Sequence, residues 1–325
     1  MRRKKIAIVG LGDIAQKAYL PILGQHPGVQ IEGILSRRRE TVEAIGERYR
    51  IQGRFLELEA LLARDLDAVF VHSPTETHEA IVTACLEREI AVYVDKPLAY
   101  ELEACERMAE AARARGTLFA VGFNRRFAPM YAEARAWLEE AGGFDLCAAQ
   151  KHRTRPQALS ARETMYDDLI HVVDLLLWLG AGPHELLGCL QERDGDGRLL
   201  HVSGSLALGR GLSSEADGRR GSKGAMAWFS MNRRAGADLE KLELHGGGRS
   251  VEVTNLESAV WRDARTGESK RQFGSWEPIG VRRGFAGAVE HFLETLDTPE
   301  KCTIRADRVL ETHRLIERLC REGEK

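Results

Sequence analysis

Residues 5–23, KIAIVGLGDIAQKAYLPIL, determine how the N-terminal part of this chain folds. Ile6–Val9 are a short apolar run of the kind found in buried strands, and Gly10–Ala15 follow as a G-x-G-x-x-A turn. After the turn, apolar residues recur at helical spacing: Ala15, Ala18, Tyr19, Ile22 and Leu23. A strand, a glycine turn and a helix in this order are the context in which the pyrophosphate of a dinucleotide binds.

The residues of this turn have separate roles in that interpretation. Gly10 permits the tight turn, Gly12 lets backbone N–H groups approach a pyrophosphate, and Ala15 lets the helix pack close to the strand. Asp13 and Ile14 lie at the start of the helix, where unpaired N–H groups and the positive end of the helix dipole face the phosphates. The alternative interpretation is a tight turn that binds no ligand.

Composition narrows the class of protein. A length of 325 residues predicts about two domains. The formal charge of −2 gives no indication of a nucleic-acid or membrane partner. Six scattered cysteines without a C-x-x-C pair predict reduced thiols and no metal site. Because no apolar run approaches membrane-spanning length and no signal segment is evident, we expect a cytoplasmic protein. Its expected partner is a small-molecule substrate.

Strand-like and helix-like segments alternate up to residue 121. Strands are predicted at Val29–Leu35, Asp67–His72, Ile90–Val94 and Leu118–Val121, with helices between them. This alternation predicts a doubly wound parallel sheet, in which ligands bind beyond the carboxyl ends of the strands. Four segments at those ends are therefore expected to converge on one crevice: Gly10–Ala15, Ser73–His78, Asp95–Pro97 and Asn124–Arg126.

The end of the second predicted strand bears on the choice of cofactor. An acidic residue there would bind the ribose hydroxyls of NAD, but this chain has Ser36, Arg37, Arg38 and Arg39, and its first acid is Glu40. A guanidinium group is planar and permanently charged, and it suits a phosphate. The sequence therefore favours NADP, with NAD as the other possibility. The alternative is a solvated basic start to the next helix.

Two further features could carry chemistry. Lys96 follows an apolar strand and precedes a proline, where partial burial and a nicotinamide cation would lower its pKa; the alternative is an exposed loop lysine. Residues 162–180 predict a helix on which Asp167, His171 and Asp174 share one face. Flanking carboxylates would make His171 hold its proton more strongly. The alternative is the solvated face of an amphipathic helix.

The remainder of the chain is mainly β. Six segments between residues 185 and 264 read as strands without long helices between them, which predicts an antiparallel sheet. Residues 209–224 are rich in Gly, Ser and Arg, and we expect a long loop there. Two basic clusters, Asn232–Arg234 and Arg282–Gly284, are expected either on the surface or beside the substrate.

With these residues placed, the whole chain resembles the glucose–fructose oxidoreductase/inositol dehydrogenase (Gfo/Idh/MocA) family. The motifs that carry the resemblance occur in order: GLGDIA, SPTETH with Pro74 and His78, DKP, GFNRRFAP, and Asp167, His171 and Asp174 in D-x-x-x-H-x-x-D. The phrases GFNRRFAP, YDDLIHVVD and MNRRAG are similar to the MviM-like branch. The chain departs from the family in having Asp95 for glutamate, and Glu163–Met165 and Leu169 where glycines are usual.

The resemblance implies an α/β chain: an N-terminal Rossmann domain with a doubly wound parallel sheet (residues 1–123) and a C-terminal α+β domain with a large, mostly antiparallel open sheet (residues 124–325). The sheet would make homodimer or homotetramer contacts. A cis peptide is expected before Pro97. Lys96 would orient or protonate the reacting oxygen, His171 would be the main acid/base, and Asp167 would hold the histidine or bind substrate. The expected cofactor-binding residues are Gly10, Gly12, Asp13, Ile14, Ala15, Ser36, Arg37, Arg38, Ser73, Pro74, His78, Asp95, Lys96, Asn124 and Arg126.

Three functions follow from these residues. The first is an NAD(P)-dependent oxidoreductase, with NADP favoured, that transfers a hydride between nicotinamide and a secondary alcohol or ketone such as a sugar or cyclitol derivative. The second is a reductase of a non-sugar substrate: a dihydrodiol, an imine or a tetrapyrrole. The third is a dinucleotide-binding regulator without turnover. Relatives of the second kind do not all keep the histidine, and relatives of the third kind tend to lose the lysine or the histidine. This chain has both Lys96 and His171.

Overall fold

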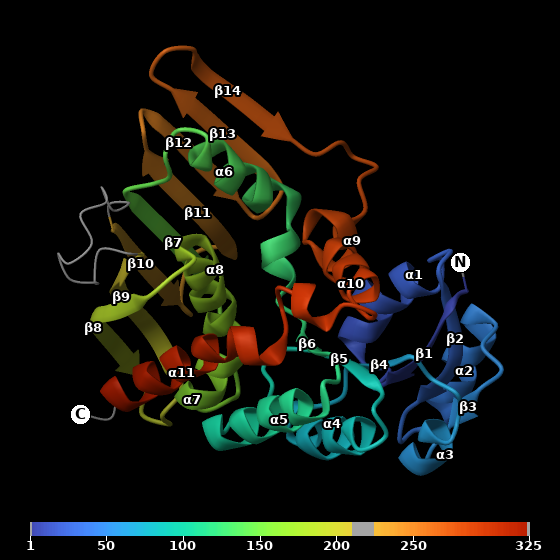
Figure 1. Cartoon of the computed structure of the whole chain (residues 1–325). Coiled ribbons are helices and arrows are strands. Elements are labelled where there is room, and N and C mark those ends of the chain that lie inside the picture. The colour runs from blue at the N-terminus through green and yellow to red at the C-terminus, as the bar shows by residue number, and fades with distance from the viewer. Residues whose placement is uncertain (1, 210–223, 324–325) are drawn as a thin grey trace. The chain divides into compact units, whose positions relative to one another are not determined.

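A computed structural model describes residues 2–209 and 224–323, and the chain divides into two compact units (Figure 1). Unit 1 contains residues 1–124 and 285–311, and unit 2 contains residues 125–284 and 312–325. The sequence interpretation had placed residues 285–311 in the second domain. Their contacts lie within unit 1, where the backbone of Val121 donates to Ile304. Most of the predicted loop at 209–224 lies outside the described residues.

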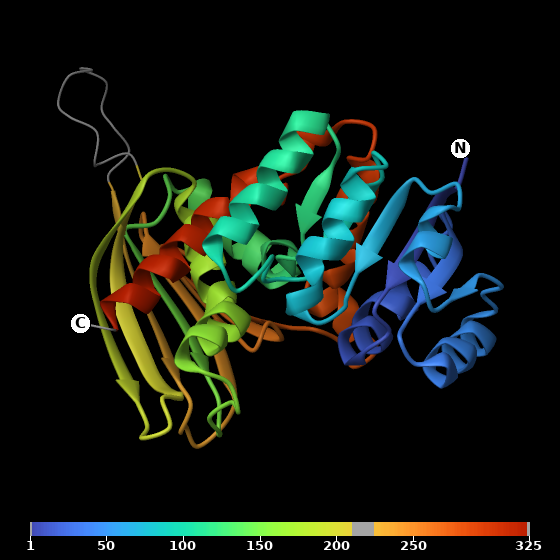
Figure 2. The same cartoon turned by 90° about the horizontal axis from the view of Figure 1, so that it is seen from below.

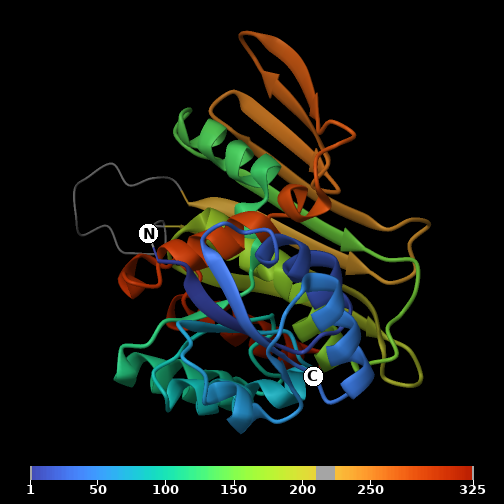
Figure 3. The ribbon, with the colours of Figure 1, turned by 90° about the vertical axis from the view of Figure 1, so that its right-hand side faces the viewer.

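Unit 1 is built around a six-stranded parallel sheet in the order β3-β2-β1-β4-β5-β6. Its strands are β1 (Lys4–Val9), β2 (Val29–Leu35), β3 (Arg54–Phe55), β4 (Ala68–Val71), β5 (Ala91–Val94) and β6 (Phe119–Val121). The strands β4 and β5 and residues 6–9 of β1 are apolar and buried because helices cover both faces of the sheet (Figure 3). This confirms the predicted doubly wound sheet, and only the two-residue strand β3 was not foreseen.

The helices of unit 1 alternate with these strands. They are α1 (Leu20–Leu23), α2 (Arg39–Tyr49), α3 (Leu58–Leu62), α4 (His78–Leu86), α5 (Leu102–Arg115) and α10 (Phe285–Glu294), followed by α11 (Ala306–Glu322), which continues into unit 2. A π-helical turn, Ala15–Tyr19, precedes α1 directly. Short 3₁₀ turns lie at Thr75–Thr77, Asn124–Phe127 and Pro299–Lys301.

Unit 2 contains an eight-stranded sheet in the order β14-β13-β12-β11-β7-β10-β9-β8. Its strands are β7 (Leu146–His152), β8 (His184–Arg193), β9 (Leu199–Leu208), β10 (Ala225–Asn232), β11 (Leu239–Gly246), β12 (Arg249–Thr254), β13 (Ser258–Asp263) and β14 (Gly267–Gln272). All neighbouring pairs are antiparallel except β7 and β10. The predicted mostly antiparallel sheet is therefore confirmed.

The helices of unit 2 are α6 (Pro129–Glu139), α7 (Ala161–Thr164), α8 (Ile170–Gly180) and α9 (Ile279–Arg282). Figure 2 shows α8 and the end of α11 on one face of the sheet, while the described residues place no helix on the other face. Strand alternation follows this arrangement, since Ala227 and Phe229 are buried on the helix side and Trp228 is 36% exposed on the open side. Within the described ranges, no helix combines the length and apolar character that crossing a membrane requires.

Candidate functional site

The glycine turn of unit 1 joins β1 to the π-helical turn, and Gly10 and Gly12 meet different constraints there. Gly10 has a φ of +88°, and a Cβ at this position would lie 2.4 Å from the backbone nitrogen of Ser73. Only glycine fits such a site, because the backbone of Ser73, in the loop after β4, occupies the space that a Cβ would need. A Cβ on Gly12 would meet no atom within 4 Å. The protein itself therefore does not require glycine at position 12.

The open space over Gly12 bears on whether a dinucleotide fits this turn. The pyrophosphate of a dinucleotide approaches the backbone at the second glycine of such a turn. The neighbouring side chains leave that approach open: Asp13 is exposed and pairs with Lys17 at 2.7 Å, and Ile14 is 39% exposed. Ala15, by contrast, is fully buried against the sheet. These residues fit the phosphates of a dinucleotide.

The end of β2 lies beside the glycine turn, since the backbone nitrogen of Gly10 donates to the carbonyl of Leu35 at 2.9 Å. Ser36 follows, and its hydroxyl accepts a long bond (3.4 Å) from the backbone of Arg38. Arg37 and Arg38 are exposed. Among the described residues, no hydrogen bond or ion pair engages either guanidinium group. Both are thus available to an anion next to the turn.

The loops after β4 and β5 are tied together by His78. Its Nδ1 lies 3.0 Å from the carbonyl oxygen of Pro97 and its Nε2 lies 3.0 Å from that of Ser73. His78 is 1% exposed, and burial lowers its pKa although Asp95 and the nearby carbonyls oppose this. Together with the contact of Gly10 against Ser73, this brings three of the four predicted strand-end segments to one edge of the sheet.

Asp95 anchors a buried polar cluster beneath these loops. Its Oδ2 lies 2.9 Å from Nδ1 of His72, whose ring stacks on Tyr19 at 3.9 Å between centroids. Burial disfavours the charged carboxylate, but His72 outweighs it and lowers the pKa of Asp95. Lys96 follows directly and is half-buried, and the predicted cis peptide before Pro97 is present. Pro74 begins the short turn that leads into α4.

In unit 2, the helix that carries His171 is not a regular α-helix. Ser160 caps its start in a capping box with Glu163, and residues 165–169 form a π-helical turn before α8. The alternative of a solvated face is wrong, because His171 and Asp174 are 7% and 1% exposed.

Both predicted carboxylates of this helix have partners within unit 2. Asp174 accepts two bonds from Arg126, at 2.8 and 2.6 Å, and one from Thr312 at 3.1 Å. Asp167 accepts a bond from Gln157 at 2.8 Å. Arg126 therefore fastens the segment after Asn124 to α8, and its predicted contact with the cofactor stays a prediction. Asn124 is buried and ends unit 1.

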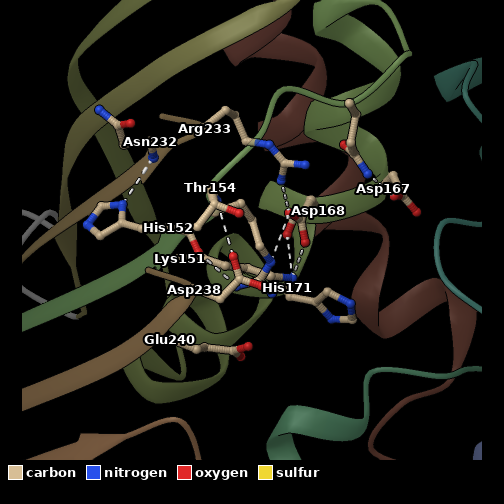
Figure 4. A network of polar contacts seen from close by, with 12 residues as sticks. Lys151, His152, Thr154, Asp167, Asp168, His171, Asn232, Arg233, Asp238 and Glu240 are labelled. Carbon is tan, nitrogen blue, oxygen red and sulfur yellow. Dashed lines mark hydrogen bonds and ion pairs between the residues drawn. The ribbon is translucent and has the colours of Figure 1, made fainter. Parts of the chain in front are cut away.

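Asp168, which the sequence interpretation passed over, is the centre of a charged network (Figure 4). Lys151 from β7 and Arg233 from the end of β10 both form ion pairs with its carboxylate. Lys151 also donates to the backbone carbonyl of Asp168 at 3.2 Å. Burial raises the pKa of Asp168, but Lys151, Arg153 and Arg233 together hold it well below its usual range. The network fastens the π-helical turn to the sheet.

A second buried pair lies beside His171. Arg125 binds Glu240 of β11 through two bonds of 2.8 and 3.1 Å, and its third nitrogen, Nη1, lies 3.4 Å from Nε2 of His171. Glu240 also lines a pocket of about 250 Å³. The other residues of this pocket are Arg153, Asp238, Asn255, Leu256, Glu257 and Arg283. The predicted basic clusters thus contribute Arg233 to the network and Arg283 to this pocket.

The sequence carries a signal for these buried ion pairs: charged residues at strand positions where alternation predicts a buried side chain. Lys151 alternates with Cys147 and Ala149 on the buried side of β7, and Glu240 alternates with Leu242 on the buried side of β11. A charge at a core position needs a partner of opposite sign, because an isolated buried charge is costly. Arg125 and Asp168 are those partners.

Known proteins match both parts of the chain. Residues 4–123 match the oxidoreductase family with an NAD-binding Rossmann fold, and residues 129–263 match the YceM-like C-terminal domain. YceM of Salmonella typhimurium is 35% identical over 99% of this chain and 99% of its own length. An inositol 2-dehydrogenase/D-chiro-inositol 3-dehydrogenase of Shouchella clausii is 33% identical over 54% of this chain and 52% of its own length.

A crystal structure gives the same result for the fold. The dehydrogenase MviM from Clostridium difficile is 31% identical and superimposes with a TM-score of 0.88, covering 99% of this chain and all of that protein. The glycine turn, the parallel sheet and the open antiparallel sheet are thus accompanied by sequence identity along the whole length. The chain belongs to the Gfo/Idh/MocA family of oxidoreductases, in its MviM-like branch, with an NAD(P)-binding Rossmann domain at its N-terminus.

Proposed function

We propose that this protein is an NADP-dependent dehydrogenase or reductase that acts on a secondary alcohol or ketone of a sugar or cyclitol derivative. The observation that carries the proposal is that Lys96 and His171 occur together, at the family's motif positions, in a chain whose glycine turn leaves room for a dinucleotide. When bound, the dinucleotide supplies or accepts a hydride. Identity to an inositol dehydrogenase over about half of that protein supports a polyhydroxylated substrate.

The preference for NADP rests on the end of β2. Arg37 and Arg38 are exposed there and beside the glycine turn, so a 2′-phosphate would meet two permanent positive charges. The described residues offer these guanidinium groups no carboxylate, and Ser36 supplies a hydroxyl where NAD-specific folds have an acid. An NAD-specific site would repel the same phosphate.

In the proposed roles, Lys96 orients the reacting oxygen and exchanges a proton with it, and His171 is the second group that handles the proton. Asp167 binds substrate or holds the histidine. Proposed dinucleotide contacts are Gly10, Gly12, Asp13, Ile14, Ala15, Ser36, Arg37, Arg38, Ser73, Pro74, His78, Asp95, Lys96, Asn124 and Arg126. For His78 and Asp95, the buried contacts described above support a role in shaping the loops that carry Ser73, Pro74 and Lys96.

We further propose that two or four copies associate through the open face of the sheet in unit 2. Leu146, Met226, Trp228 and Leu190 are 36–68% exposed there, and strand register places them on one side. Several exposed large apolar side chains on one face are typical of an interface between subunits.

Deuterium transfer tests the proposed reaction directly. The protein is incubated with NADPH deuterated at the transferred C4 position and with a panel of keto-sugars and cyclitol ketones. Mass spectrometry should find one deuterium in an alcohol product. If no compound of the panel, nor any dihydrodiol precursor, imine or tetrapyrrole, takes up deuterium while NADPH binds tightly, the regulator function is favoured.

A further inference from the structure

The ring of His171 lies against a permanent cation. Nη1 of Arg125 is 3.4 Å from Nε2 of His171, and both residues are 7% exposed. A guanidinium group has five N–H donors, no acceptor, and does not lose its proton in proteins. In any hydrogen bond between these two atoms, Arg125 donates and the Nε2 lone pair accepts. Nε2 therefore carries no proton in this arrangement.

Glu240 fixes the guanidinium in that position. Nε and Nη2 of Arg125 donate to the two carboxylate oxygens of Glu240, and this pairing directs Nη1 toward the histidine. Burial opposes the charged form of Glu240, but Arg125 and Lys151 outweigh it and lower its pKa to about 2. The carboxylate is thus ionised at neutral pH, and the fork of Arg125 has one preferred orientation.

We propose that Arg125, held by Glu240, is a positioning residue that keeps His171 as the neutral tautomer with its proton on Nδ1. An imidazolium ring would place its positive charge and its Nε2–H against the charge and the N–H groups of Arg125. The two cations would repel each other, and neither N–H would have an acceptor in the other group. Nδ1–H then donates a hydrogen bond to an oxygen of the substrate, which narrows the role of His171 in the proposed function: it orients and polarises this oxygen, while Lys96 exchanges the proton with it. This catalytic consequence rests on the proposed function, whereas the tautomer itself does not.

The other charged groups on the helix of His171 are balanced within unit 2. Asp168 is neutralised by Lys151 of β7 and by Arg233, as Figure 4 shows. Asp174 is bound by Arg126 and Thr312, and Asp167 accepts from Gln157. The expectation that flanking carboxylates raise the pKa of His171 is therefore opposed by Arg125, whose charge acts in the other direction.

Nitrogen NMR of the full-length protein tests the tautomer without any substrate. The wild type is labelled with ¹⁵N in histidine, and the His171 signals are assigned by their loss in His171→Gln. At neutral pH, Nε2 should show the shift of a nitrogen without a proton, and Nδ1 that of a protonated one. A protonated Nε2, alone or together with Nδ1, would overturn the proposal.

Two variants separate positioning from a merely structural role. Arg125→Met removes the cation at similar length, so the titration midpoint of His171 should rise by about one pH unit or more, and Nε2–H should appear. Arg125→Lys keeps the charge but loses the fork, and should raise the midpoint less. Arg262→Met, at an exposed position of β13, is the control and should leave both readings unchanged. Destabilisation with an unaltered tautomer and midpoint in Arg125→Met would contradict the proposal.

Kinetics distinguishes this inference from the proposed function. If His171 contributes as proposed, the acidic limb of the kcat profile in Arg125→Met should move to higher pH by the same amount as the NMR midpoint. A wild-type spectrum with Nδ1–H, combined with full turnover in His171→Gln, would retain the positioning by Arg125 and reject the catalytic role of His171. A wild-type spectrum with Nε2–H, combined with loss of turnover in His171→Gln, would reject the positioning by Arg125 and retain the catalytic role of His171.

Discussion

Gly10 and Gly12 belong to one turn, but they are glycines for different physical reasons. At Gly10 the fold forbids a side chain, since φ is +88° and the backbone of Ser73 occupies the position of a Cβ. At Gly12 the fold leaves open space, so the absence of a side chain leaves room for a bound ligand. The pair allows folding and dinucleotide binding to be measured separately.

Gly10→Ala should therefore destabilise the protein and Gly12→Ala should not. Thermal unfolding should show a loss on the order of 1–3 kcal/mol for Gly10→Ala, because strained backbone and displaced neighbours both contribute. Gly12→Ala should unfold at the wild-type temperature and bind NADPH at least tenfold more weakly by fluorescence titration. Normal NADPH affinity in folded Gly12→Ala would contradict the assignment of the open space to the pyrophosphate.

Arg37 permits a test of the cofactor preference at one side chain. NADPH should bind more tightly than NADH to the wild type, because the 2′-phosphate meets Arg37 and Arg38. Arg37→Asp replaces an attraction for the 2′-phosphate with a repulsion. The NADH dissociation constant divided by the NADPH dissociation constant should therefore fall by about tenfold or more, so that the preference for NADPH shrinks or reverses. Arg48→Asp, in the last turn of α2, is a matched control. Equal affinities of the wild type for both cofactors would contradict the preference.

At this scale the sequence predicted the residues that follow local rules. The glycine turn and the basic end of β2 each depend on neighbours in the chain, whereas the cis bond before Pro97 was expected from the family resemblance. Arg125, Asp168 and Glu240 were missed because their partners are distant in sequence: Arg125 and Glu240 are 115 residues apart. Such pairs become visible only when strand alternation shows a charge pointing inward, as at Glu240.

At the scale of the elements, the helix over residues 161–180 shows where periodicity is insufficient. The segment was predicted with nearly correct limits, because its apolar content and terminal glycine are local signals. The π-helical turn at residues 165–169 was not predicted, because the apolar spacing indicates only a regular α-helix. The buried network at Asp168 holds that turn, and this tertiary contact outweighs the regular α-helical spacing.

Asp168→Asn should therefore be strongly destabilising. It leaves Lys151 and Arg233 buried without their counter-charge, which typically costs about 3–5 kcal/mol. Because the folded protein holds the pKa of Asp168 below its usual value of 3.8, its stabilisation is present above about pH 4 and is lost as the pH falls further. Denaturant unfolding from pH 7 to 3 should show this acid loss in the wild type and less of it in the variant.

Asp196→Asn provides the control for that measurement. Asp196 is exposed and only weakly paired with Arg198 at 3.4 Å, so its removal should change stability by less than about 1 kcal/mol. Equal effects of the two substitutions would show that the network at Asp168 does not hold the helix to the sheet.

At the scale of the molecule, the open face of the sheet predicts self-association. Replacing Met226 with glutamate puts a charge into the apolar surface beside Leu146, whose strand pairs with it directly. Sedimentation velocity should find a dimer or tetramer for the wild type and a large shift to monomer for Met226→Glu. Glu268→Lys, on the exposed edge strand β14, should leave the assembly unchanged. A monomeric wild type at micromolar concentration would contradict the proposed interface.

The central claim is that Lys96 and His171 perform the chemistry of a dinucleotide-dependent oxidoreductase. The most direct test is the single-turnover rate of NADPH oxidation by the best ketone of the panel, measured in the wild type, Lys96→Ala, His171→Ala and the exposed-lysine control Lys270→Ala. General acid–base groups contribute roughly 10²–10⁴-fold. The rate should fall by that range in Lys96→Ala and His171→Ala, with NADPH affinity and the Lys270→Ala rate nearly unchanged. Wild-type rates in both Lys96→Ala and His171→Ala would contradict the claim.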